Sequence, residues 1–401
     1  MSEKALQGIK VLDFTNVLAG PYCSMMLGNM GAEIYKVEKP AGDDSRAFGP
    51  HVNGESTYFL SINRGKKSIV CDTKTDHGIG MFKRLVAKVD ILVENLKPGA
   101  MERMGLGYDV LREINPRLIY VAVSGFGHSG PYSPRPSYDM IVQGMGGIIS
   151  ITGTPGGETA RVGTSIGDIT AGMFGAFGAV SALYQRTVSG KGQKVDVAML
   201  DGQVAILENA IAKYSATGVV PEPLGLRHPA ITPFGAFKTK DTSVIVACGN
   251  DRLFKAFCEA IGAEELLKDE RFTSNALRNN NVAELSLLIE EKTMLRATSE
   301  WMELLVDKGV PCGPINTVDK LFEDPQVLAR NMLVEIEQPK IGKLKVAGNP
   351  VKMSLVDAAD ELPNDPAPGI GEHTVEVLTK LLGYSEQEAV EYFQSFQPEQ
   401  K

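Results

Sequence analysis

Short runs rich in β-branched and apolar residues alternate with helical stretches in the first half of the chain, and this alternation constrains the fold most. The runs span residues 8–14, 33–38, 67–72, 90–94, 118–124 and 194–199. Helical stretches lie between them, for example at residues 20–30 and 73–89. Parallel strands joined by crossover helices have this pattern. We therefore predict an α/β fold containing a doubly wound parallel sheet.

The loops that follow the predicted strands carry positive charge. Ligands bind beyond the carboxyl ends of the strands in such sheets, and Lys39, Lys74 and Lys97 fall in these loops. Three lysines there favour an anionic, polyphosphate-like ligand. The formal net charge is -8 and no basic tract stands out, so we expect no nucleic-acid partner.

The pattern changes after about residue 216. Strands at 234–238 and 243–248 predict a hairpin, and helices are expected at 251–261, 281–294 and 299–308. These residues predict a smaller α+β domain. Two short strands near 334–346, a proline-rich segment at 362–368 and a final helix pair at 372–382 and 386–396 complete the chain.

The five cysteines and five histidines are scattered, without a Cys-x-x-Cys pair. We therefore expect reduced thiols, no disulfide framework and no metal site. The N-terminal residues contain no apolar signal segment, and no run of about 18 apolar residues occurs. The expected location is the cytoplasm, without a membrane partner.

Residues 125–130 read Gly-Phe-Gly-His-Ser-Gly and satisfy the G-x-G-x-x-G pattern after a strand. A dinucleotide site needs a helix directly after this loop to receive the pyrophosphate. The next residues, Pro131 to Pro136, contain three prolines and cannot propagate a helix. A nicotinamide oxidoreductase is therefore disfavoured. The chain also lacks the P-loop motif, and we find no basis for pairing a histidine with a nucleophile, as serine hydrolases require.

Asp168 is the remaining candidate for chemistry. It follows Gly167 and opens a stretch, poor in charge, that extends to about Leu183. Its ordinary interpretation is an N-cap, because an aspartate oxygen accepts hydrogen bonds from the first free N–H groups of a helix. A catalytic carboxylate is the alternative.

The chain resembles the class III CoA-transferases, which include formyl-CoA transferase and carnitine CoA-transferase, over nearly its whole length. The matching blocks include LQGIKVLDFTNVLAGP, GAEIYKVEKPAGDDSR, NRGKKSIVCDTK, VENLKPGAMERMGLGYDVL, INPRLIYVAVSGFGHSGP, the Asp168 segment, SGKGQKVDVAML, GVPCGPINTVDKLFEDPQVLARNM and GEHT. The resemblance implies a large domain built from both chain ends (residues 1–216 and 348–401), a small domain (231–316) and linkers (217–230 and 317–347). It also implies an interlocked homodimer.

The resemblance further implies that Asp168 is the nucleophile. Its carboxylate would attack an acyl-CoA thioester to form a mixed anhydride, and the released CoA thiolate would then form an aspartyl-CoA thioester. Coenzyme A thioesters are substrates in this interpretation, and no tightly bound cofactor is expected. The partners are an acyl-CoA and a small carboxylic acid.

Several segments match the CoA-contacting segments of the family. Four of these residues also have an interpretation without a ligand. Lys39 and Arg103 would then be solvated surface charges, Tyr138 a packing aromatic and Asp139 a helix cap. The predicted CoA contacts are Val17, Leu18, Lys39, Cys71, Asp72, Thr73, Lys74, Asn95, Leu96, Lys97, Arg103, Pro136, Ser137, Tyr138 and Asp139.

Two departures bear on the substrate. The formyl-CoA:oxalate enzymes carry a glutamine where this chain has Leu18, and a tetraglycine loop where residues 226–235 have no glycine run. The closer likeness is to the succinyl-CoA-dependent branch that activates dicarboxylates; formyl-CoA:oxalate transfer is an alternative. Arginine binds carboxylates bidentately, so the second carboxylate has four candidate partners: Arg46, Arg135, Arg161 and Arg227.

The α-methylacyl-CoA racemases share the fold and also place an aspartate at the position of Asp168. They need a second base, a histidine where this chain has Tyr138. Tyrosine, whose ordinary pKa is near ~10, is a poor general base at neutral pH, so transfer is favoured over epimerisation. A non-catalytic CoA-binding module is a third alternative, disfavoured by the presence of Asp168.

Overall fold

The computed structural model describes residues 4–357 and 365–396. The chain divides into two compact units, one of residues 1–149, 161–219 and 325–401 and the other of residues 150–160 and 220–324. The first unit is thus built from both ends of the chain. Residues 150–160 group with the second unit and residues 325–347 with the first, which differs from the expected domain bounds. Residues 358–364 and 397–401 of the expected C-terminal part, including the start of the proline-rich segment, lie outside the described residues.

The first unit contains a six-stranded sheet in which every neighbouring pair is parallel, with the order β5-β2-β1-β6-β7-β8. This confirms the predicted doubly wound sheet. The chain order reverses between β1 and β6, so the loops after these two strands flank the switch point where ligands of such sheets bind. The strands are β1 (Lys10–Phe14), β2 (Glu33–Glu38), β5 (Lys67–Val70), β6 (Ile91–Glu94), β7 (Ile119–Ser124) and β8 (Lys194–Ala198).

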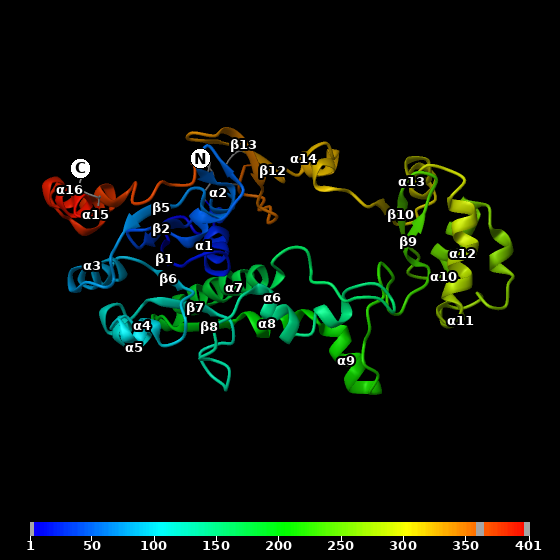
Figure 1. Ribbon diagram of the computed structural model, residues 1–401, viewed down its shortest axis with the longest axis horizontal. Helices are drawn as coiled ribbons and strands as arrows, with labels where there is room; N and C mark the ends of the chain where they lie inside the picture. The colour runs from blue at the N-terminus through cyan, green and yellow to red at the C-terminus, as the bar shows by residue number, and fades with distance from the viewer. Residues whose placement is uncertain (1–3, 358–364, 397–401) are drawn as a thin grey trace. The chain divides into compact units, whose positions relative to one another are not determined.

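Alternate residues of the strands pack into two cores, one on each face of the sheet. The first core includes α1 (Ala19–Asn29) and α7 (Ile166–Ser189). The second includes α3 (Asp76–Val86), α5 (Tyr108–Ile114) and the C-terminal helices α15 (Thr374–Leu382) and α16 (Glu386–Gln394). The C-terminal helices therefore lie beside elements from the first third of the chain (Figure 1).

Glycines let α7 approach α1 closely. A Cβ atom at Gly172 would lie 2.8 Å from the backbone oxygen of Ala19, and one at Gly175 would lie 3.2 Å from Cys23 Sγ. The two contacts run in the same direction along both helices, so the first turn of α7 lies near the start of α1. Helix α7 is also long and apolar enough to cross a membrane by length and composition, but half of its apolar window is buried inside the protein, as in a core helix.

Smaller elements complete the first unit. Helix α2 was not predicted because it is short; it is capped by Ser56, whose Oγ accepts a hydrogen bond from the backbone N–H of Phe59 at 3.1 Å. The other elements are η1 (Asp44–Ala47), β3 (His51–Val52), β4 (Glu55–Ser56), α2 (Thr57–Asn63), α4 (Ala100–Arg103), α6 (Asp139–Met145), α8 (Met199–Ile206), α9 (Glu208–Thr217), α14 (Pro325–Ala329), β12 (Leu333–Gln338) and β13 (Gly342–Ala347).

The second unit is an α+β structure, as predicted. The expected hairpin is β9 (Phe234–Lys238) and β10 (Ser243–Ala247), and β11 (Cys312–Pro314) adds a third antiparallel strand that the sequence did not predict. Phe257, Phe272 and Trp301 contribute to its core. The helices are α10 (Asp251–Ile261), α11 (Asn275–Asn280), α12 (Val282–Thr293) and α13 (Thr298–Asp307).

Candidate active site

Asp168 lies in the first turn of α7, which begins at Ile166. Ser165 occupies the N-cap position, so the prediction that Asp168 caps this helix is wrong. The capping bond comes instead from α6, where Asp139 Oδ1 accepts a hydrogen bond from the backbone N–H of Gly167 at 2.8 Å. Within the described part of the chain, the Asp168 carboxylate has no hydrogen bond or ion pair. It is therefore free to react.

The surroundings of Asp168 disfavour its charged form. Burial raises the pKa of Asp168 to about 7, and the negative charge of Asp139 adds to the rise. Asp139 is fixed in place because Gln143 Nε2 donates to its Oδ2 at 2.7 Å, and an Arg161 guanidinium nitrogen lies 4.0 Å from the same oxygen. Above pH 7, Asp168 is an ionised and poorly solvated carboxylate, a state that favours nucleophilic attack.

Tyr58, on α2, is a neighbour of Asp168 that the sequence did not predict. Burial, followed by the charges of Asp168, Asp139 and Asp43, raises the pKa of Tyr58 to about 12. The hydroxyl is therefore protonated at neutral pH and can donate a hydrogen bond near the reactive carboxylate. The Ser56 cap before an apolar run was the one sequence signal for this helix.

The glycine-rich loop after β7 is not followed directly by a helix, as predicted, and α6 begins only at Asp139. Tyr138 takes the N-cap position of α6, and its side chain is 75% exposed. Asp139 is therefore the first residue of its own helix and caps α7 instead. Pro136 is exposed and Ser137 is half-buried.

The loop after β1 has a strained backbone. Val17 has a φ of 66°, which is rare for a β-branched residue and is held by surrounding contacts. The backbone N–H of Val17 donates to Asp43 Oδ1 at 3.1 Å. Before it, Asn16 and Asn95 exchange two hydrogen bonds of 2.8 Å each, which tie the loops after β1 and β6 together across the switch point. Leu18 follows as a buried residue.

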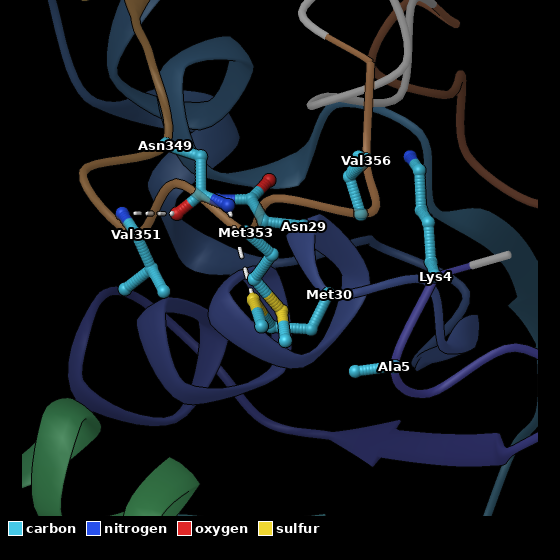
Figure 2. Close-up of a pocket in the computed structure, with 8 residues that line it drawn as sticks. All are labelled: Lys4, Ala5, Asn29, Met30, Asn349, Val351, Met353 and Val356. Carbon is cyan, nitrogen blue, oxygen red and sulfur yellow. Dashed lines mark hydrogen bonds between the residues drawn. The ribbon is translucent and has the colours of Figure 1, made fainter. Parts of the chain in front are cut away.

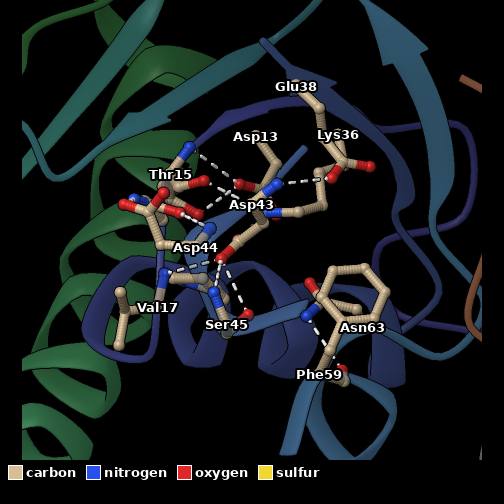
Figure 3. Close-up of polar contacts among 12 residues, drawn as sticks. Asp13, Thr15, Val17, Lys36, Glu38, Asp43, Asp44, Ser45, Phe59 and Asn63 are labelled. Carbon is tan, nitrogen blue, oxygen red and sulfur yellow. Dashed lines mark hydrogen bonds and ion pairs between the residues drawn. The ribbon is translucent and has the colours of Figure 1, made fainter. Parts of the chain in front are cut away.

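A network of buried charges lies beneath this loop (Figure 3). Lys36 Nζ lies 2.8 Å from Asp43 Oδ2 and donates to the Thr15 carbonyl oxygen at 3.1 Å. Lys66 Nζ lies 2.9 Å from Asp13 Oδ2. Although burial alone would raise the pKa of Asp13, Lys66 and Lys36 lower it well below its ordinary range. The network fixes the position of the loop from below.

The other predicted contact residues lie on the loops after β2, β5 and β6 and on α4. Lys39 pairs with Asp44 at 2.5 Å, and both side chains are half-exposed. Cys71 is buried, with Sγ donating to the Gly78 carbonyl oxygen at 3.3 Å, and burial raises the pKa of its thiol to about 12. Any ligand contact of Cys71 must therefore involve its backbone. Asp72, Thr73 and Leu96 are half-buried, whereas Lys74, Lys97 and Arg103 are exposed.

The four arginines expected to bind a second carboxylate differ in their environment. Arg46 makes hydrogen bonds of 2.8 and 2.7 Å to Glu38 and is therefore already paired. The exposed Arg135 stacks on Tyr132, with 3.8 Å between the guanidinium carbon and the ring centre. The remaining two are Arg161, which lies beside Asp139, and Arg227, which belongs to the second unit.

A cavity of about 770 Å³ lies beside the first turn of α7. Its walls are mainly apolar and come from α1, α2, α7 and the segment after β13. Ser165 and Ile169, on either side of Asp168, contribute to the lining, as do Leu18 and Tyr58. Asp168 is thus a sequence neighbour of residues that line a space large enough for a small organic substrate, although the lining does not include Asp168 itself.

Comparisons with known proteins identify the family of the chain. Residues 6–374 match the family model of CoA-transferase family III. The chain is 44% identical over 361 residues to an acetyl-CoA:oxalate CoA-transferase of Acetobacter aceti, which covers 90% of this chain and 92% of the relative. It is 40% identical over 386 residues to the human succinyl-CoA:glutarate CoA-transferase, covering 96% of this chain and 87% of the relative.

A solved structure of a CAIB/BAIF family protein from Brucella suis has a TM-score of 0.84 and 39% sequence identity, and the match covers 95% of this chain and 100% of that chain. The sequence match extends through both parts of the large unit and through the small one. The chain therefore belongs to CoA-transferase family III and is an enzyme that uses CoA thioesters as substrates.

Proposed function

We propose that this CoA-transferase moves CoA from a short acyl-CoA, such as succinyl-CoA, to a small dicarboxylic acid, with Asp168 as the covalent nucleophile. The observation that carries the proposal is the state of the Asp168 carboxylate. Among the residues that the structure describes it has no partner, its pKa is raised to about 7, and its neighbours Ser165 and Ile169 line a cavity of about 770 Å³. A desolvated carboxylate that is ionised above neutral pH suits reversible acyl transfer.

The proposed reaction has four steps without net proton transfer. Asp168 attacks the thioester carbonyl of the donor, the C–S bond breaks, and a mixed anhydride and CoA thiolate form. The thiolate attacks the aspartyl carbonyl and releases the donor acid, which leaves an aspartyl-CoA thioester. The carboxylate of the acceptor attacks this thioester and expels the thiolate again. The thiolate finally attacks the acceptor acyl carbon, which restores Asp168 and gives the new acyl-CoA.

Each step develops negative charge on a carbonyl oxygen. The protonated hydroxyl of Tyr58, whose pKa is raised partly by the charge of Asp168, is a suitable donor for such an oxyanion. The exposed Lys39, Lys74 and Lys97 follow strands that end at the ligand-binding edge of the sheet, and they suit the phosphates of CoA. We propose that the predicted contact residues hold CoA at this edge.

The named relatives support a carboxylic acid as acceptor. The human relative is named for succinyl-CoA and glutarate, and a Chloroflexus aurantiacus relative for succinyl-CoA and D-citramalate. The Acetobacter relative is named for acetyl-CoA and oxalate. We favour a dicarboxylate longer than oxalate as acceptor, and oxalate belongs in the test panel.

We propose a homodimer that covers the outer face of α7. Met173, Phe177, Val180, Tyr184 and Val188 recur at helical spacing on this face and are all exposed, and the first three also line the cavity near Asp168. An apolar stripe of this length is typical of a subunit interface. A cytoplasmic location is proposed because the five cysteines are all free thiols.

The test uses succinyl-CoA and a panel of acids that includes glutarate and oxalate, with new CoA esters identified by mass spectrometry. Hydroxylamine should convert Asp168 to a hydroxamate only in the presence of acyl-CoA. Asp168→Asn should transfer no CoA. Full transfer by this variant, or epimerisation of a 2-methylacyl-CoA without an acceptor, would refute the proposal.

A further inference from the structure

Arg64 is a buried cation for which residues 4–357 and 365–396 supply no counter-charge. It ends α2, and its side chain and backbone together are only 3% exposed. Its guanidinium donates to the Ser61 carbonyl oxygen at 3.1 Å, to Asn29 Oδ1 at 3.3 Å and to Met25 Sδ at 3.5 Å. The buried Nε has no partner. All of these acceptors are neutral.

The other buried cations in the described residues differ from Arg64 in this respect, because each has a carboxylate within 2.6–2.9 Å. These pairs are Lys36 with Asp43, Lys66 with Asp13, Arg186 with Asp90 and Arg278 with Asp251. A buried charge is costly unless it is paired. An uncompensated guanidinium therefore suggests that its counter-ion is supplied by a ligand.

Arg64 lines the same cavity as the residues around Asp168. The cavity extends along α1 from Leu18 to Met30, and Asn349 and Val351 contribute to its lining beside Met30. Figure 2 shows a smaller neighbouring pocket, to which Asn29, Met30, Asn349 and Val351 also contribute. Between these limits the walls are apolar, as the methylene chain of an acid requires.

Two helices give similar separations between residues near Asp168 and residues near Arg64. Leu18 lies near the first turn of α7, and Met25, which contacts Arg64, follows seven residues later, about 10 Å along the axis. Tyr58 lies close enough to Asp168 for the charge of Asp168 to raise the pKa of its hydroxyl. Arg64 follows six residues later at the end of α2, about 9 Å along the axis of that helix. A contact of about 3 Å at each end, a nucleophile-to-carbon contact at Asp168 and a hydrogen bond at Arg64, leaves a chain of several carbons between two carboxyl groups.

We propose that Arg64 binds the remote carboxylate of a dicarboxylic acyl group whose other carboxyl carbon reacts at Asp168. The inference rests on the proposed function and deepens it, because it names the residue that selects dicarboxylates. A guanidinium matches a carboxylate with two parallel hydrogen bonds. An acid with about three methylene groups between its carboxyls fits the spacing, whereas oxalate is too short to reach both groups.

The experiment compares glutarate with pentanoate, in which a methyl group replaces the remote carboxylate. With saturating donor, Arg64→Met should raise the KM for glutarate by about 100-fold and leave the KM for pentanoate within a few-fold, because a buried charge pair is lost only with glutarate. The KM of Arg64→Lys for glutarate should lie between those of the wild type and Arg64→Met, since lysine keeps the charge without the bidentate geometry. Arg112→Met, on the exposed face of α5, is the matched control and should change neither value.

Binding provides a second readout that does not depend on catalysis. Calorimetry on Asp168→Asn with CoA present should show tighter binding of glutarate than of pentanoate, and Arg64→Met added to this variant should abolish the difference. Equal losses for both acids, or an unchanged glutarate KM, would overturn the inference. A change of oligomeric state in Arg64→Met would also overturn it, because the counter-ion would then belong to a second copy. Failure of the wild type to transfer CoA to any acid would instead refute the proposed function.

Discussion

Replacing Asp168 by asparagine removes a charge that the folded protein disfavours, so the variant is expected to be more stable than the wild type at pH 8. The pKa of Asp168 rises from an ordinary 3.8 to about 7 on folding, mainly through burial and then through Asp139. One pKa unit corresponds to about 1.4 kcal/mol, so the full penalty is roughly 4 kcal/mol. Because the side chain is partly open to solvent, we expect a gain of about 2–4 kcal/mol.

The effect of Asp168→Asn on the free energy of unfolding depends on pH. Below pH 3.8 the carboxyl is protonated in both states, and Asp168→Asn should have little effect through this charge. Between pH 3.8 and about 7 the folded state keeps a proton that the unfolded state has lost, so wild-type stability falls as the pH rises. Above pH 7 the penalty is complete, and the advantage of the variant reaches its maximum.

Urea denaturation at pH 4.5 and pH 8, at one protein concentration, measures the effect. Asp201→Asn is the matched control, because Asp201 also lies in the first turn of a helix but is exposed. That change should destabilise by about 0.3–1 kcal/mol through the lost interaction with the helix dipole. A loss of stability in Asp168→Asn like that of the control, or a gain that is the same at both pH values, would refute the reasoning.

Three further predictions concern the same unit. The value of kcat/KM should fall about tenfold per pH unit below pH 7 as Asp168 is protonated. Asp139→Asn should shift this acidic limb of the pH profile to lower pH. An acidic limb that does not shift would contradict the role of Asp139. Lys66→Met should destabilise by about 3–5 kcal/mol in urea denaturation because it leaves Asp13 buried without its cation, and the double change with Asp13→Asn should recover part of the loss. Gly167→Ala should reduce kcat, because the added Cβ would lie 3.0 Å from Asp139 Oδ1. Steady-state kinetics measures the effect, and calorimetric melting is the control for folding. An unchanged kcat would contradict a close fit at Gly167.

The sheet and its connections were predictable because they depend on local patterns. Strands buried on both faces need continuous β-branched runs, and their order along the chain dictates crossovers. The predicted strand at 67–72 is shorter in the structure and ends at Val70. Thr75 caps α3 by accepting a hydrogen bond from the backbone N–H of Gly78 at 3.0 Å, and the residues before Thr75 form the turn into this helix. Short helices such as α2 were missed because their periodicity is too brief to recognise.

The candidate site was predictable only where a resemblance or a loop position pointed to single residues. Asp168 was identified in this way, but its capping role was wrong because Asp139, from another helix, accepts the bond. The four candidate arginines were chosen only because a guanidinium binds a carboxylate bidentately. Arg64 was overlooked because a sequence does not show which cations are buried without a carboxylate.

The sequence by itself determined the α/β class, the parallel sheet and the membership of the transferase family, since each depends on ordered local blocks of residues. The tertiary structure alone decided the chemistry of the site. It packs α6 against α7 and brings Tyr58 of α2 within range of the charges of Asp139 and Asp168, although more than 100 residues separate Tyr58 from Asp168. The raised pKa of Asp168 and the uncompensated charge of Arg64 both arise from burial, which is a property of the packed chain.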